Sequence, residues 1–65
     1  MEYLDRLRTE RNELGTRVGK LGNFLLGDAV KVVDNEELHL LREQLEAMET
    51  YLKVLNLRIA IGENK

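Results

Sequence analysis

The first half of the chain carries apolar residues at helical spacing. Between residues 3 and 26 they recur at steps of three and four, which places them in one stripe along a helix. The stripe consists of Leu4, Leu7, Leu14, Val18, Leu21 and Leu25, with Arg11 in the one slot that breaks it. Gly27 follows directly, where a left-handed C-terminal cap is expected. The pattern predicts a helix over about residues 3–26.

The second half repeats this spacing and begins with a capping signal. Asp34 is a favourable N-cap residue, and Glu37 stands three residues later, as in a capping box. The second stripe consists of Leu38, Leu41, Leu45, Met48, Leu52, Leu55 and Ile59. Gly62 is expected to end the helix, so the pattern predicts a helix over about residues 35–61. The valine-rich connection, residues 27–33, is expected to be an extended loop.

Two helices of similar length joined by a short connection favour an antiparallel arrangement. The predicted fold class is therefore all-α, an antiparallel two-helix hairpin in which residues 1–65 form a single domain. A chain of this size buries only about 60% of the surface that it exposes when unfolded, and it contains no cysteine for a disulfide. Partner subunits are the remaining means of stabilisation.

A second apolar row on the second helix supports this expectation. Leu40, Ala47, Val54 and Ile61 recur at intervals of seven and widen the apolar face to about half of the helix circumference. One partner helix does not cover a face of that width. We therefore expect assembly into a homo-oligomeric helical bundle, with the number of subunits open; the alternative is that these side chains are simply exposed.

Three glycines inside the first predicted helix also point to a close neighbour. Gly15, Gly19 and Gly22 lie on one side of that helix. Each lowers the stability of the helix by about 0.5–1 kcal/mol relative to alanine. Such a strip lets another backbone or a flat ligand approach closely, and we place it with the outer row in the oligomer interface. A bent or frayed helix is the alternative interpretation.

The composition argues against an enzyme and against a metal site or cofactor. The chain has no cysteine and no serine, and His39 is its only histidine. A net charge of −2 argues against general nucleic-acid binding. No apolar run approaches the roughly 18 residues of a membrane span, and the absence of cysteine fits a cytoplasmic location.

One group of side chains could hold an anionic ligand with a flat ring. In an antiparallel hairpin the row that contains Tyr51 faces the row that contains Arg17, and Lys20 is one turn away. An aromatic ring beside basic side chains can stack a base and hold a phosphate. Arg11 is added to this set if its guanidinium points into a pocket between subunits; otherwise it extends outward along its aliphatic stem. The alternative for Tyr51 is an amphipathic tyrosine with ion pairs at the core edge.

Two stretches resemble a family of short helical proteins of tailed bacteriophages and prophages, described as related to a crAss-like phage protein. One is Glu10-Arg11-Asn12-Glu13-Leu14, and the other runs from Gln44-Leu45 through Met48 and Tyr51 to Arg58-Ile59. The chain departs from the family at its three helix glycines and its valine-rich connection, which implies a different ligand preference if these positions shape a pocket.

The resemblance implies a small accessory protein made in the cytoplasm of the host cell. Small oligomeric phage proteins include sponges that sequester the cyclic nucleotides of CBASS and Thoeris immunity. By this analogy we expect an anti-defence sponge that holds its ligand between subunits, with Arg11, Arg17 and Lys20 on phosphates and Tyr51 on a base. The alternative is a protein-interaction module whose second helix binds and blocks a host or phage protein.

Overall fold

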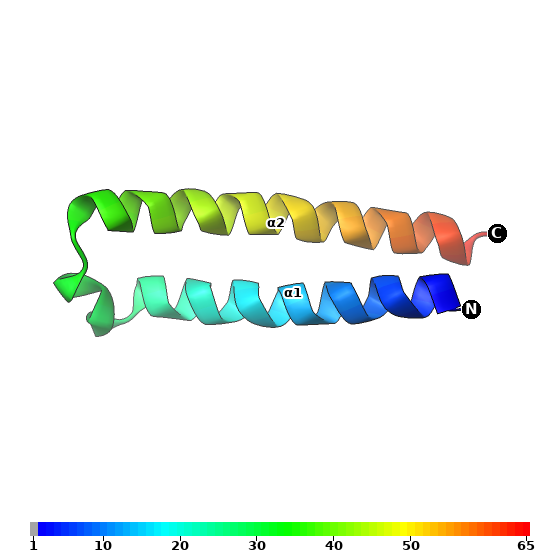
Figure 1. Cartoon of the computed structure of the whole chain (residues 1–65), viewed down its shortest axis with the longest axis horizontal. Coiled ribbons are helices and arrows are strands. Elements are labelled where there is room, and N and C mark those ends of the chain that lie inside the picture. The colour runs from blue at the N-terminus through cyan, green and yellow to red at the C-terminus, as the bar shows by residue number, and fades with distance from the viewer. Residues whose placement is uncertain (1) are drawn as a thin grey trace.

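Two long antiparallel helices make up the computed structural model, which describes residues 2–65 (Figure 1). Helix α1 spans Glu2–Leu26, a short 3₁₀ helix η1 spans Asp28–Val32, and α2 spans Asn35–Glu63. The rod measures 48 × 15 × 14 Å, and the N and C labels lie together at one end of it (Figure 1). The all-α hairpin predicted from the sequence is confirmed.

The start of α2 also agrees with the sequence. The Asp34 carboxylate accepts a hydrogen bond from the backbone N–H of Glu36 at 3.3 Å and so caps the helix. The expected end at Gly62 is wrong, because α2 continues to Glu63. The backbone N–H of Asn64 still donates to the carbonyl of Ala60 at 3.2 Å, so helical hydrogen bonding passes through the glycine.

The connection differs from the extended loop that its valines predict. Residues 28–32 form η1, in which Val32 is exposed while Val30 is half-buried. The predicted left-handed cap at Gly27 is also wrong: its φ is −91° and its ψ is 175°, which is extended backbone. Gly27 instead precedes the first residue of η1, and its N–H donates to the Phe24 carbonyl at 3.2 Å.

The core is a single line of side chains between the two helices. The four buried members all come from the predicted stripes; they are Leu7, Leu14, Leu55 and Ile59. Leu4, Val18, Met48 and Leu52 are half-buried and pack against them. Nearer the connection, stripe residues such as Leu21 and Leu41 reach only half-burial. The hairpin is therefore packed most tightly toward its open end.

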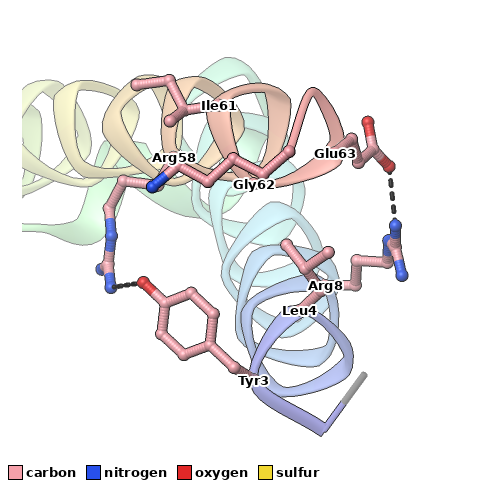
Figure 2. A pocket seen from close by; sticks show the side chains of 8 residues that line it. Tyr3, Leu4, Arg8, Arg58, Ile61, Gly62 and Glu63 are labelled. Atoms are coloured by element: carbon pink, nitrogen blue, oxygen red, sulfur yellow. Dashed lines mark hydrogen bonds and ion pairs between the residues drawn. The ribbon is translucent and has the colours of Figure 1, made fainter.

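At the open end the side chain of Leu4 in α1 lies against Gly62 of α2. A Cβ atom added there would collide with Cδ2 of Leu4, which lies directly beneath the glycine (Figure 2). The glycine that was expected to end α2 therefore lets Leu4 enter the seam.

The glycine strip of α1 behaves differently. A Cβ added at Gly15, Gly19 or Gly22 would meet no atom within 4 Å. No contact within a single hairpin accounts for these glycines, and their place in an oligomer interface stays a prediction.

Replacing the most buried leucine should cost far more than replacing an exposed one. Leu55 is 0% exposed, and we expect Leu55→Ala to lower the free energy of unfolding by about 2–5 kcal/mol because it leaves a cavity in a one-layer core. Leu26→Ala is the matched control, since Leu26 is 87% exposed and should change stability by less than about 0.5 kcal/mol. Urea unfolding followed by circular dichroism measures both; equal effects would contradict the described core.

The Leu4–Gly62 contact predicts coupling between these two positions. Alanine at position 62 gains helix propensity, about 0.5–1 kcal/mol, but collides with Leu4. We therefore expect Gly62→Ala to stabilise the chain only when Leu4→Ala is also present. Asn23→Ala, at an exposed position of α1, also gains helix propensity and should stabilise both backgrounds equally. Thermal unfolding of the four combinations gives the coupling energy, and simple additivity would refute the contact.

Candidate functional site

The seam between the helices is flanked by two edges of different chemistry. On one edge, Nη2 of Arg8 donates to Oε2 of Glu63 at 2.7 Å. On the other edge, Nη2 of Arg58 donates to the hydroxyl oxygen of Tyr3 at 3.1 Å. Figure 2 shows these two pairs on opposite sides of Leu4. We call the first the ion-pair edge and the second the aromatic edge.

Residues seven apart keep to the same side of a hairpin of this kind. The aromatic edge therefore continues from Tyr3 to Arg17 and Phe24 along α1, and from Arg58 back to Tyr51 along α2. This edge holds every aromatic side chain of the sequence. All three are open to solvent, with Tyr3 60%, Tyr51 45% and Phe24 37% exposed. Exposed rings gathered on one edge with two arginines form the most distinctive surface of the hairpin.

Three of the four ligand-binding residues predicted from sequence belong to this surface. Arg17 and Tyr51 are on the aromatic edge itself. Lys20 is exposed and neighbours Arg17 and Phe24 on the surface of α1, three and four residues away. The Tyr3–Arg58 bond confirms that the two rows face each other. One heptad further along, the same register places Tyr51 opposite Glu10, and the next heptad places Arg17 opposite Gln44.

Arg11 is placed elsewhere. Its Nη1 donates to Oδ1 of Asn56 at 3.3 Å, and its Nε donates to Oδ1 of Asn12 at 2.8 Å. Since Asn56 is seven residues before Glu63, Arg11 extends toward the ion-pair edge. A single hairpin therefore does not bring Arg11 together with Tyr51.

The ion-pair edge is largely satisfied within the hairpin. Glu63 accepts from Arg8, and this hydrogen bond raises the pKa of Arg8 above its ordinary value. Gly15 and Gly22 follow Arg8 at intervals of seven, so part of the glycine strip lies along this edge. The edge bears no aromatic ring, and its polar contacts set the register of the two helices.

The open end of the hairpin holds a cavity of about 740 Å³ that sequence reasoning did not identify. Its lining includes Tyr3, Arg8, Arg58, Ile61, Glu63 and Lys65. Three of these side chains are basic and one is acidic, although the whole chain has a net charge of −2. The acidic one, Glu63, is paired with Arg8. Tyr3 lies in the same seven-residue row as Arg17, and Arg58 lies in the same row as Tyr51. Extending these two rows to the ends of the helices would have predicted this part of the site from the sequence.

This arrangement suits an anionic ligand with flat rings. Exposed tyrosine rings stack on bases, and guanidinium groups hold phosphates by charge-assisted hydrogen bonds. Within residues 2–65, no group of three or more His, Cys, Asp or Glu side chains could hold a metal ion. Neither long helix of that region is apolar enough to cross a membrane.

Comparison with known proteins gives one match. A family model described as Sequestin matches residues 1–61, while no curated protein and no solved structure matches the chain. The name suggests a protein that sequesters a molecule, in agreement with a binding role. The phage setting inferred from the sequence resemblance stays a prediction. Because the match covers nearly the whole chain, the protein belongs to the Sequestin family.

Proposed function

We propose that this hairpin is a non-enzymatic phage accessory protein that sequesters a cyclic-nucleotide immune signal of the host cell, such as those of CBASS or Thoeris. It acts as a homo-oligomer and holds the ligand between subunits. The observation that carries the proposal is the aromatic edge: every aromatic ring of a Sequestin-family chain is exposed there, beside Arg17 and Arg58.

The proposed binding mode divides the ligand between two kinds of side chain. The Tyr51 ring stacks on a base, which contributes about 1–3 kcal/mol per base. Arg17 and Lys20 hold the phosphates. Arg11 lies toward the ion-pair edge, so it contributes only where that edge of another copy closes over the ligand. Sequestration requires no reaction, since tight stoichiometric binding is enough to remove a signal.

A single hairpin cannot enclose a ligand at this edge. The three rings are between 37% and 60% exposed, and the edge runs along a rod only about 15 Å thick. Small-molecule sites bury most of the ligand surface. A second surface must therefore cover the ligand, which fits a pocket made between subunits.

Removing Arg17 and Lys20 from α1 should weaken ligand binding without changing assembly. We expect Arg17→Ala with Lys20→Ala to weaken cyclic-nucleotide binding at least 10-fold per lost phosphate contact, since charge-assisted hydrogen bonds contribute about 1.5–3 kcal/mol each. Native mass spectrometry with cyclic di- and trinucleotides and cyclic ADP-ribose isomers reports bound mass and subunit number together.

The matched control, Arg42→Ala with Lys53→Ala, removes two exposed cations from the other helix, α2. This variant has the same change in net charge and should bind like the wild type. If the wild-type protein binds no member of the panel, or if both variants lose affinity equally, the proposed site is wrong.

A second candidate function is a protein-interaction module that blocks a host or phage protein. The observation that favours it is the outer row of α2, in which Leu40, Val54 and Ile61 are 57%, 45% and 61% exposed and Ala47 is also exposed. An amphipathic helix with such a face can dock into an apolar groove of another protein.

Charging the outer row tests whether any function depends on that face. We expect Leu40→Glu with Val54→Glu to leave α-helical circular dichroism but to reduce the native mass to that of one chain, 7.5 kDa. His39→Glu with Lys53→Glu has the same spacing on another side of α2 and adds at least as much negative charge, so it should still assemble. In a phage-defence assay, wild-type behaviour of both the outer-row variant and the Arg17–Lys20 variant would reject both candidate functions.

A further inference from the structure

The outer row and the aromatic edge form one continuous surface on α2. Val54 is three residues after Tyr51 and four before Arg58, so these side chains are neighbours on the helix. Ile61, the last member of the row, lines the open-end cavity together with Tyr3 and Arg58. Whatever covers the outer row therefore also borders the candidate ligand site.

The charges of α2 are divided between its two halves. Residues 35–49 contain five acidic side chains and one basic one, whereas residues 50–65 contain three basic side chains and one acidic one. A helix of this kind is complementary to a second copy of itself that runs in the opposite direction. In a parallel pair, like charges would face each other along the whole length.

We propose that the outer row is covered by α2 of a second copy, packed antiparallel about a two-fold axis between Ala47 and Val54. The four row members are spaced evenly about that point, so Leu40 meets the partner's Ile61 and Ala47 meets the partner's Val54. A two-fold interface is self-complementary, as this row is. The smaller pair lies at the centre and lets the two helices approach closely there.

The same register pairs the flanking residues favourably. The row that contains Tyr51 and Arg58 continues to Lys65 in one direction and to Gln44 and Glu37 in the other, at intervals of seven. Lys65 then lies beside the partner's Glu37, and Arg58 beside the partner's Gln44. All of these positions are exposed in the single hairpin.

The axis also brings Tyr51 next to the partner's Tyr51. In each hairpin the row of α1 that faces the ring contains Glu10 and Arg17, and the two aromatic edges form one groove across the dimer. This step rests on the proposed function: the groove would hold one ligand that presents two bases and two phosphates to a two-fold site. Each copy supplies half of that site.

Disulfide trapping tests the interface directly, because the chain contains no cysteine of its own. Ala47→Cys and Val54→Cys are prepared as separate proteins, mixed and oxidised. We expect the mixture to form the crosslinked heterodimer. Neither variant alone should crosslink, because a cysteine and the same cysteine of the second copy lie about 10 Å apart along an antiparallel helix pair.

The matched control uses Glu46→Cys mixed with Lys53→Cys. These positions have the same seven-residue spacing, but they lie about 100° around the helix from the outer row and should stay unlinked. Efficient crosslinking of Ala47→Cys or Val54→Cys with itself would show a parallel pair and overturn the proposal. A mixture of the two that crosslinks no better than the control would overturn it as well.

The shared ligand site has its own readout. Native mass spectrometry of the trapped dimer with cyclic dinucleotides should show one ligand per two chains, and none after Tyr51→Ala. Two ligands per dimer would overturn the shared site while leaving the interface intact. If neither trapped nor wild-type protein binds a nucleotide, the proposed function fails and the shared site with it. The crosslinking pattern still decides the interface in that case.

Discussion

Two helices have only one seam between them, and the rest of this molecule depends on that limit. A side chain in the seam is covered by one neighbouring helix, so only four apolar side chains among residues 2–65 become buried. The core of an ordinary domain has several layers, whereas this hairpin has a single line of residues. The apolar side chains outside that line have no cover within one chain, and their arrangement therefore indicates what the molecule binds.

The two edges of the seam differ in how far their polar groups are paired within the hairpin. Along the ion-pair edge, Arg8 and Arg11 are bonded to Glu63 and Asn56 of the other helix. Such exposed polar contacts stabilise a fold by less than about 1 kcal/mol each, so their main contribution is register. The aromatic edge has rings and guanidinium groups with few partners, although exposed rings contribute little to the stability of a single hairpin. Its side chains are better explained by a ligand or a second subunit.

The features predicted correctly from sequence are those with local causes. The helices and the four buried residues follow from apolar spacing, and the Asp34 cap follows from one side chain and the next turn of backbone. The two glycines at helix ends were interpreted wrongly because their environment is not local. Gly62 is explained by Leu4, which arrives from the other helix, and Gly27 leads into a 3₁₀ helix that no spacing pattern indicates.

The candidate site could be predicted only in part, for the same reason. Arg17, Lys20 and Tyr51 share a surface because they belong to rows that a hairpin must place together. Arg11 interrupts the apolar stripe, and only the structure shows toward which edge its guanidinium extends. Tyr3 belongs to the candidate site because its hydroxyl accepts from Arg58, a contact that depends on the register between two distant segments.

The position of the core determines when the protein can fold during its synthesis. Its most buried residues lie toward the open end, where Leu7 from the first turns of α1 packs with Ile59 from the last turns of α2. Contacts between residues so far apart in sequence form late, after the entropy of closing the intervening chain has been lost. On the ribosome, Leu7 must wait until Ile59 has been made. The hairpin therefore closes only after the last turns of α2 have been synthesised, and the cavity at its open end forms only then.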